Sequence, residues 1–380
     1  MRIENRSLIA ALCGVLACAG VACGGDDSRG NGGTAGSPSG SAGAPLANGG
    51  GGSSGSSAGA PSAGGTSGSA TVGSAGAGGT PVTGGPKQRT VAYLPSYRGS
   101  LATWATQLDF SLVSYVDVCF ADVDDAGNIT YKDAALGSFI SAAHAKGTKV
   151  CLALGGAGTI TNLGTLGTQI APANRAAFVG KLTSYAMSTG LDCIDVDLEG
   201  DGVNQDYEGF VTTLGPALKA QGKEMSAALA SWFGDKVTTV ALKAFDFVNV
   251  MAYDLHNPGG SATPVQSSSM EDSKKEIDYW LGRGLSKEKA VFGVPFYGYR
   301  WKPGAASGEA VVYAELLSKY GAAAQGDQIT QDGVTIYLNS KATIVAKAQA
   351  AREYGGIMIW ELGQDAMGEA SLLRAINSAP

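Results

Sequence analysis

The chain carries eight short apolar runs that alternate with stretches of helical periodicity. Between the runs, apolar positions recur at helical spacing, as in Phe178, Leu182 and Tyr185, and Gly190 follows as a residue that ends a helix. Strands that alternate with helices favour parallel βα units, and eight such strands are the number that closes a (β/α)8 barrel of the TIM type. We therefore predict an α/β fold of this kind. The eight predicted strands are residues 90–94, 112–120, 149–154, 193–199, 225–230, 245–253, 290–296 and 356–360.

The longest connection in this pattern joins the seventh and eighth strands, over residues 297–355. It contains an alternating piece at residues 328–338, with Asp332-Gly333 as its turn signal, followed by a helical stretch at 341–353. We predict a short insertion at this point of the barrel.

Residues 1–23 have the pattern of an export signal. Two arginines precede an apolar run at residues 8–22 that is too short and too rich in alanine for a membrane span. Residues 20–23, Gly-Val-Ala-Cys, resemble a bacterial lipoprotein cleavage box, so we predict a lipid on Cys23. The alternatives are lipidation at Cys18 and an ordinary cleaved secretory signal. The expected location is the outer membrane or cell surface, and otherwise the medium.

Residues 24–87 form a low-complexity segment of Gly, Ser, Ala, Thr and Pro without any aromatic residue. Such a composition cannot bury enough apolar surface to offset the entropy lost on ordering. A Gly/Ser coil of this length has a root-mean-square span of roughly 40–45 Å. We predict a disordered tether, followed by one folded domain at residues 88–380.

Charge and cysteine usage exclude several classes of function. The formal net charge of −6 argues against nucleic-acid binding, which requires a basic surface. Cys119, Cys151 and Cys193 fall in predicted strands and are interpreted as small buried apolar residues, of which an odd number leaves at least one free thiol. Their spacing is not that of a metal site, and only His144 and His256 supply imidazole. We predict a monomer without metal or cofactor.

Residues 192–199, Asp-Cys-Ile-Asp-Val-Asp-Leu-Glu, are the most informative segment. In a strand, Asp195, Asp197 and Glu199 share one face, and the apolar residues between them share the other. Three acids on one face cannot all ionise cheaply, so their pKa values are driven apart. A solvated edge strand does not explain the apolar opposite face. A calcium loop would need a turn-forming glycine and carbonyl ligands at set positions.

The pattern Asp-x-x-Asp-x-Asp-x-Glu of residues 192–199 resembles the signature of family-18 glycoside hydrolases, the chitinase family. Residues 153–156, Ala-Leu-Gly-Gly, look like the Ser-x-Gly-Gly of that family at the end of barrel strand three. Residues 251–254, Met-Ala-Tyr-Asp, look like its Met-x-Tyr-Asp on strand six, and Trp360 stands where the family keeps the tryptophan that ends strand eight. The resemblance covers residues 88–377, in the family's order.

The resemblance implies roles for the acids. Glu199 would protonate the glycosidic oxygen and then act as base toward water, while the 2-acetamido oxygen of the substrate is the nucleophile. Asp197 would orient the acetamide, and Asp195 would share a proton with Asp197. Tyr253 would donate a hydrogen bond to the acetamide oxygen. Asp192 would hold the loop behind the site without touching the substrate.

Further residues are implied to contact the substrate. Trp360 would form a hydrophobic floor under the sugar at the cleaved position, and Tyr93 would touch Asp195. The complete set of predicted substrate-binding residues is Trp360, Met251, Asp254, Tyr93 and Phe120. Ala153 departs from the family serine that donates to the buried aspartate. We therefore expect Asp195 to have one donor fewer and a higher pKa.

The function implied by the resemblance is that of a retaining glycoside hydrolase. It would cleave β-1,4 bonds in chitin or N-acetylglucosamine oligomers by substrate-assisted catalysis. The alternatives are an endo-β-N-acetylglucosaminidase that acts on N-glycans and a non-catalytic sugar-binding barrel. Relatives of the last kind usually lose the final acid, whereas Glu199 is present. The family often carries a full α+β insertion before strand eight. The one here looks trimmed, which implies a shallow, open cleft.

The tether and its anchor generate the first prediction. Deleting residues 24–86 should leave the melting temperature and oligomer hydrolysis unchanged, because that segment has no core to contribute. Cys23→Ser should release the protein from the membrane fraction at unchanged specific activity. Fractionation followed by mass spectrometry of the N-terminus is the measurement. Membrane association that persists in the variant, with no lipid on residue 18, would contradict the anchor.

Overall fold

The structure is a computed structural model that describes residues 88–157 and 163–379. The predicted signal peptide at 1–23 and tether at 24–87 lie outside the described residues, as do residues 158–162. Within the described ranges, no helix combines the length and the apolar character needed to cross a membrane.

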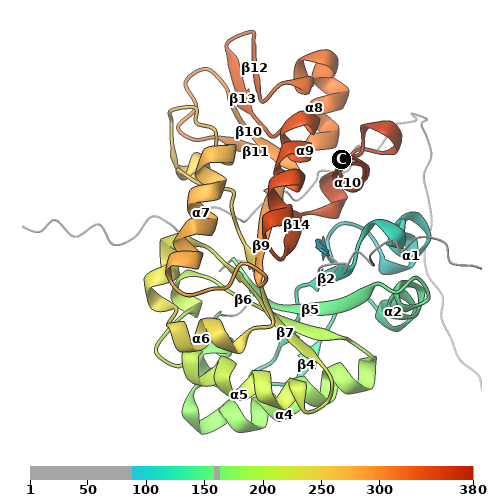
Figure 1. The fold of residues 1–380 in the computed structure, drawn as a ribbon, viewed down its shortest axis with the longest axis vertical. Helices are drawn as coiled ribbons and strands as arrows, with labels where there is room; N and C mark the ends of the chain where they lie inside the picture. The colour runs from blue at the N-terminus through green and yellow to red at the C-terminus, as the bar shows by residue number, and fades with distance from the viewer. Residues whose placement is uncertain (1–87, 158–162, 380) are drawn as a thin grey trace, which may run out of the picture. The chain divides into compact units, whose positions relative to one another are not determined.

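A closed barrel of eight parallel strands forms the centre of the fold (Figure 1), which confirms the predicted (β/α)8 class. Each strand pairs with the next one around the barrel, and β14 returns to β1 through the register Val91 to Met358. The eight strands are β1 (Arg89–Pro95), β2 (Tyr115–Cys119), β5 (Lys149–Gly156), β6 (Cys193–Leu198), β7 (Glu224–Leu229), β8 (Phe247–Val250), β9 (Ala290–Pro295) and β14 (Gly356–Trp360). All eight fall within two residues of a predicted run or inside it.

Helices follow the strands and lie outside the barrel (Figure 1). The longest, α4, ends where Gly190 adopts φ of 82°, a left-handed conformation that glycine tolerates. The helices are α1 (Leu101–Gln107), α2 (Leu136–His144), α3 (Leu163–Ile170), α4 (Pro172–Thr189), α5 (Tyr207–Lys219), α6 (Thr239–Ala244), α7 (Met270–Gly282), α8 (Tyr313–Tyr320), α9 (Lys341–Ala350) and α10 (Leu372–Asn377). A small hairpin, β3 (Asp122–Val123) with β4 (Ile129–Thr130), follows β2.

Two apolar layers result from the alternation of side chains along each strand. Ile194, Val196 and Leu198 belong to the larger core between the barrel and its helices. The opposite faces of the strands fill the barrel interior with a second cluster that includes Tyr93 and Phe247. Because β6 faces both layers, its three apolar residues point outward and its acids point inward.

The insertion before the last barrel strand has a sheet of its own. It contains a four-stranded antiparallel sheet in the order β11-β10-β13-β12, together with α8. Figure 1 shows this sheet and α8 at one end of the ribbon, in orange. The strands are β10 (Tyr297–Trp301), β11 (Glu309–Val312), β12 (Gln328–Gln331) and β13 (Val334–Tyr337). The sequence pattern predicted the β12–β13 hairpin, whereas β10 and β11 were not predicted.

Two of the three barrel cysteines form a disulfide, and the third is a free thiol. Cys151 on β5 and Cys193 on β6 occupy paired positions of adjacent strands and form a disulfide. Cys119 is buried and free. The expected free thiol is therefore present, but two of the three cysteines are cross-linked rather than simply apolar. In the chain-entropy description, closing a loop of this 42-residue separation stabilises the fold by about 4 kcal/mol.

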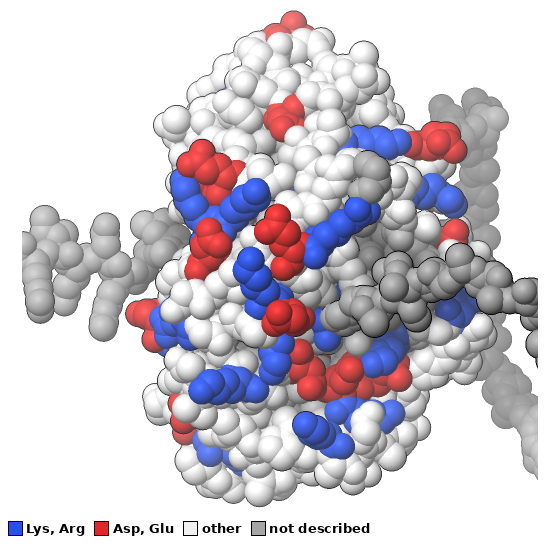
Figure 2. Space-filling model, in the orientation of Figure 1, with Lys and Arg blue, Asp and Glu red and all other residues white. Residues whose placement is uncertain are grey.

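Charged groups of both signs are interspersed on the surface that Figure 2 presents, without an extended field of one sign. Among the ion pairs of the described residues, Arg300 on β10 pairs with Glu309 at 2.9 Å and with Glu315 at 3.4 Å.

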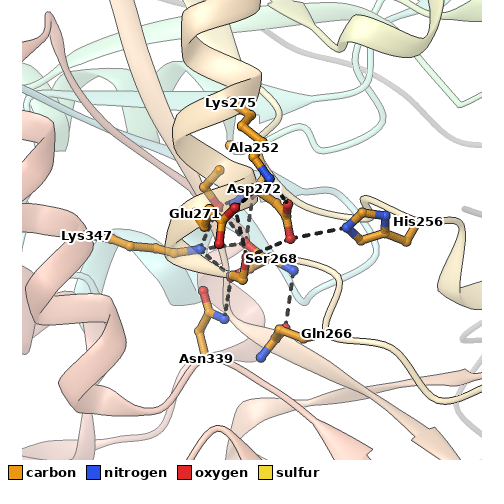
Figure 3. A network of polar contacts seen from close by, with 11 residues as sticks. Ala252, His256, Gln266, Ser268, Glu271, Asp272, Lys275, Asn339 and Lys347 are labelled. Carbon is orange, nitrogen blue, oxygen red and sulfur yellow. Dashed lines mark hydrogen bonds and ion pairs between the residues drawn. The ribbon is translucent and has the colours of Figure 1, made fainter.

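A buried lysine ties α9 to the chain that follows β8 (Figure 3). Lys347 is fully buried, and its Nζ donates to the backbone oxygen of Ser268 at 2.6 Å and to the hydroxyls of Ser268 and Ser273 at 2.7 and 2.9 Å. These three acceptors match the three protons of an ammonium group. Both hydroxyls in turn donate to the carbonyl of Ala252, and Asn339 donates to the Ser268 carbonyl. The network thus fixes the backbone just before residue 253.

Burial lowers the pKa of Lys347 to about 7, against the opposing effect of Asp327 and Asp272. In the unfolded chain a lysine keeps its proton to about pH 10.4. Between these values the unfolded state binds more protons than the folded state, so the folded state gains stability as the pH rises. The stabilising contribution is complete above the unfolded pKa and is lost as the pH falls toward 7.

The second prediction follows from this difference. The stability of the wild type relative to Lys347→Met should increase from pH 7 to pH 10, by at most about 1.4 kcal/mol per pH unit. Urea unfolding at pH 6, 8 and 9.5 measures it. Lys341→Met, at the exposed start of the same helix, is the matched control and should show no such trend. Parallel stability curves for the wild type and Lys347→Met would contradict the assignment.

Candidate active site

The predicted site residues other than Asp192 lie toward the carboxyl ends of the barrel strands, where β6 delivers two acids into the barrel interior. Asp195 is fully buried and Asp197 nearly so. Glu199 follows the last residue of β6 and is half-buried at the mouth of the barrel. The predicted shared face of these three acids is therefore the interior face.

Asp195 accepts hydrogen bonds from three strands. Its Oδ2 accepts from the Tyr93 hydroxyl at 2.7 Å, and its Oδ1 accepts from the Ser226 hydroxyl at 2.6 Å and from Asn249 Nδ2 at 3.4 Å. Burial raises the pKa of Asp195 to about 6, while the three donors counteract that rise. The predicted contact between Tyr93 and Asp195 is present.

The substitution at Ala153 does not leave Asp195 short of a hydroxyl donor. Ala153 on β5 is the register partner of Asp195 on one side, and Ser226 on β7 is its partner on the other. Ser226 supplies the hydroxyl from the opposite neighbouring strand. The pKa of Asp195 is raised as we expected, but the cause is burial rather than a missing donor.

Asp197 and Glu199 both favour their protonated forms. Burial raises the pKa of Asp197 well above its ordinary value, and the negative charges of Glu199, Asp195 and Asp117 raise it further. Its Oδ1 has no hydrogen-bond partner among the described residues. Burial, followed by the charge of Asp254, raises the pKa of Glu199 to about 7. A glutamic acid at the barrel mouth that holds its proton near neutral pH is able to act as a general acid.

Tyr253 and Asp254 reach the site from the end of β8. Tyr253 is largely buried, and its ring lies edge-on to that of Tyr297 at 6.4 Å. Asp254 Oδ1 accepts hydrogen bonds from the hydroxyls of Tyr297 and Tyr299 at 2.6 and 2.9 Å. Both tyrosines lie on β10, so the first strand of the insertion holds Asp254 in place. Met251 packs beside this group in the interior cluster.

Trp360 forms an aromatic surface at the end of β14. Its ring centroid lies 5.4 Å from that of Tyr93 and 6.2 Å from that of Phe120. The next residue, Glu361, is buried and pairs with Arg98 at 2.6 Å, which fixes the chain directly after the tryptophan. Three of the predicted substrate-binding residues therefore form one aromatic group.

Two glycines at the end of β5 allow this close packing. Gly155 has φ of 116°, and a Cβ there would lie 2.2 Å from the carbonyl oxygen of Asp197. Gly156 has φ of 93°, and a Cβ there would meet the ring of Phe120 at 2.7 Å. No side chain fits at either position without moving a site residue, which explains the Gly-Gly pair physically.

A hollow of about 210 Å³ lies beside the aromatic group. Its lining is Ser96, Tyr97, Phe120, Asp122 and Lys132, from the segments that follow β1 and β2. Tyr97 is largely exposed there. A second hollow of about 300 Å³, next to α3, contains none of the predicted site residues.

Asp192 is the one predicted residue that the structure does not bring to the site. It precedes β6, so about seven residues of extended chain, roughly 23 Å, separate it from Glu199. Its Oδ2 accepts from the backbone N–H of Val150 and lies 2.7 Å from His144 Nε2, at the opposite end of the barrel. The expectation that Asp192 holds a loop behind the site is therefore corrected: it joins strands β5 and β6 at their beginnings.

Several contributing residues were not among the predicted site residues. Ser226 and Asn249 face inward on β7 and β8, and Asp117 faces inward on β2. Tyr297 and Tyr299 follow the seventh barrel strand. Strand alternation was the available signal, since each lies an even number of positions from an inward-facing neighbour.

No group of three or more His, Cys, Asp or Glu side chains in the described part of the chain is arranged to hold a metal ion. The site offers a glutamic acid with a pKa of about 7, a second acid two positions before it and an aromatic surface. This combination is suited to proton transfer on a bound sugar, because sugars stack on aromatic rings through their apolar faces and their bridging oxygens accept protons.

Comparison with known proteins gives the family. The family model described as glycosyl hydrolases family 18 matches residues 89–365. A class V chitinase of Arabidopsis thaliana is 24% identical over 327 residues, which cover 72% of this chain and 86% of the plant protein. A chitinase-like effector of Moniliophthora roreri is 27% identical over 238 residues, which cover 55% of this chain and only 58% of the effector.

The solved structures agree with the sequence comparison. A family-18 chitinase from the chitin utilization locus of Flavobacterium johnsoniae superimposes with a TM-score of 0.70 at 32% identity, covering 77% of this chain and 94% of that one. A chitinase of Bacteroides thetaiotaomicron, 24% identical with a TM-score of 0.63, shares the fold over 76% of this chain and 95% of its own. With the acid motif at the end of β6, these matches show that the chain belongs to glycosyl hydrolase family 18 and is a glycosidase of the chitinase type.

Proposed function

We propose that this glycosidase cleaves the β-1,4 bonds of chitin or of N-acetylglucosamine oligomers, with retention of configuration and with the substrate's own acetamide as nucleophile. The observation that carries the proposal is the position of Glu199 at the barrel mouth, two residues after the buried Asp197, where burial raises its pKa to about 7. The similarity to a chitinase from a chitin utilization locus supports the choice of substrate.

In this mechanism Glu199 donates its proton to the glycosidic oxygen. The acetamide oxygen attacks the anomeric carbon from within the substrate, and the leaving group departs. Glu199, now ionised, takes a proton from the water that opens the intermediate. A pKa of about 7 suits both steps, because the group must give a proton and regain it at the same pH.

Asp197 orients the acetamide and stabilises the positive charge that develops on it. The carboxyl is suited to this role because its buried Oδ1 has no protein partner among the described residues, and a hydrogen bond from the acetamide would satisfy it. Asp195, held by Tyr93 and Ser226, has the lower pKa of the two and is able to exchange a proton with Asp197. Tyr253 would direct its hydroxyl to the acetamide oxygen.

Trp360 would support the apolar face of the sugar at the cleaved position, with Tyr93 and Phe120 behind it. Asp254, fixed by two tyrosine hydroxyls, would act beside Tyr253 at the other wall. We also propose that the enzyme is exported and held at the cell surface by a lipid on Cys23, as a monomer.

The third prediction concerns substrate and acid together. The wild type should shorten chitin oligomers and leave a high-mannose glycopeptide intact. Glu199→Gln should lower turnover by roughly 10²–10⁴ with substrate binding retained, because the amide cannot donate the proton in the same way.

In the wild type, kcat/KM should fall as the pH rises above about 7, as Glu199 loses its proton. Product analysis by mass spectrometry and a pH profile measure these effects.

Glu271→Gln is the control, since this glutamate is exposed on α7 and pairs with Lys275 rather than with a predicted site residue. It should retain full activity. Cleavage of the glycopeptide instead of chitin would identify an endo-β-N-acetylglucosaminidase, and binding of oligomers without cleavage would identify a sugar-binding barrel. Turnover of Glu199→Gln within about threefold of the wild type would remove Glu199 from the mechanism.

The fourth prediction tests the nucleophile. A thiazoline analogue of N-acetylglucosamine resembles the cyclic intermediate and should inhibit competitively, far more tightly than the free sugar binds. Substrates without the acetyl group at the cleaved position should not react. Mass spectrometry of the enzyme trapped during turnover supplies the opposite test. A sugar attached covalently to Asp197 or Glu199 would replace this mechanism with a two-carboxylate one.

A further inference from the structure

A fourth carboxyl group lies in the barrel interior next to the acids of β6. Asp117 on β2 is fully buried and is the register partner of Tyr93. Asn249 Nδ2 lies 3.3 Å from Asp117 Oδ2, 3.0 Å from the Tyr93 hydroxyl and 3.4 Å from Asp195 Oδ1. The Asn249 amide therefore connects Asp117 to the hydrogen-bond partners of Asp195. Asp117 stands outside the acid motif and has no role in the mechanism above.

Two buried oxygen atoms around Asp117 lack a hydrogen-bond donor in the described part of the chain. Asp117 Oδ1 has no partner among the described residues, and neither has Asn249 Oδ1. Both atoms are acceptors when Asp117 is ionised, so the region lacks one donor. An ionised carboxylate at this depth, with one long hydrogen bond, would carry an uncompensated desolvation cost of several kcal/mol. A proton on Asp117 Oδ1 supplies the missing donor.

The groups that face Asp117 also oppose its ionisation. They are the hydroxyl of Tyr93 on β1, Asp195 and Asp197 on β6, the thiol of Cys119 on its own strand and the uncharged amide of Asn249 on β8. Each titratable member is an acid, and none of the described salt bridges reaches Asp117. Burial and the charge of Asp195 raise the pKa of Asp117 well above its ordinary value, and only the Asn249 hydrogen bond lowers it.

We propose that Asp117 is held as a neutral carboxylic acid that pairs with the Asn249 amide and thereby aims Asn249 Nδ2 at Tyr93 and Asp195. In this pairing the acid O–H donates to Asn249 Oδ1, and the acid carbonyl, Oδ2, accepts from Asn249 Nδ2. The arrangement uses both unpartnered atoms and keeps the observed contact at 3.3 Å. Asp117 is a positioning residue, because it acts on Asp195 through Asn249 and does not touch the substrate.

The consequence for the site is that Asp195 becomes the interior carboxyl that ionises. It has three donors, of which Asn249 is one, whereas Asp117 keeps its proton and Asp197 has none of these donors. Loss of the Asn249 donor would favour the protonated form of Asp195. The part of this inference that concerns catalysis rests on the proposed hydrolysis of chitin oligomers. The part that concerns the proton on Asp117 does not.

Two substitutions separate a neutral acid from an ionised one. Asp117→Asn places an amide of the same shape opposite Asn249, and it can form the same two hydrogen bonds. Asp117→Leu has a similar size and can form neither. We expect Asp117→Asn to retain kcat within about threefold and to keep the wild-type pH profile. Asp117→Leu should raise the pKa of Asp195, because Asn249 is no longer aimed at it. The acidic limb of kcat/KM should therefore move upward by about one pH unit, and kcat at pH 6 should fall about tenfold with KM little changed.

If Asp117 were instead an ionised proton acceptor, Asp117→Asn would be as impaired as Asp117→Leu. A loss of more than about tenfold in kcat for Asp117→Asn would therefore overturn the proposal. The pH profile distinguishes positioning from a general loss of structure, since partial unfolding lowers activity without moving the limb.

Infrared spectroscopy tests the proton directly. The difference spectrum of wild type minus Asp117→Asn in D₂O should contain the carbonyl band of a protonated carboxylic acid, present from pH 6 to pH 9. A carboxylate band in its place would overturn the proposal, even if Asp117→Leu does not fold. Because this measurement needs no turnover, it also distinguishes a failure of the inference about Asp117 from a failure of the proposed function. An inactive wild type with the acid band would contradict the proposed function alone.

Discussion

The cost of placing carboxyl groups inside a barrel is the constraint on which the site depends. Asp195 and Asp197 lie where water does not solvate them, and nothing among the described salt bridges neutralises either. Hydrogen-bond donors on β1 and β7 offset part of this cost for Asp195, through Tyr93 and Ser226. Where donors are absent, protons remain on the acids instead. Burial thus raises the proton affinity of these carboxyl groups, and the donors that each position reaches decide how far that rise is counteracted.

Much of the fold was predictable because side chains alternate along every barrel strand between the barrel interior and the surrounding helices. The period-two alternation at residues 193–199 placed the acids on the interior face and their apolar neighbours against the helices, as the structure has them. The order of eight runs was sufficient to indicate a closed parallel sheet. Trp360 and Tyr253 were predicted through the resemblance to the family motifs, and both lie at or just after the end of a barrel strand, where barrel enzymes place their functional groups.

The remaining features depend on contacts between strands that are distant in sequence. Ser226 replaces the hydroxyl missing at Ala153 only because β7 lies on the other side of β6. The disulfide between Cys151 and Cys193 requires equal height on β5 and β6, which a one-residue change in register would remove. Asp192 belongs to the acid motif in sequence but lies at the other end of the barrel, because a strand is long compared with the site.

The hydrogen bonds from β10 to Asp254 limit how far this enzyme could be reduced in size. Tyr297 and Tyr299 belong to the insertion by topology, yet their hydroxyls hold a carboxyl group of the barrel. The insertion is therefore not an exchangeable module. A shortened descendant could lose α8 and the outer strands, but it would have to retain the first strand after β9, or find new donors for Asp254, before any hairpin could be removed.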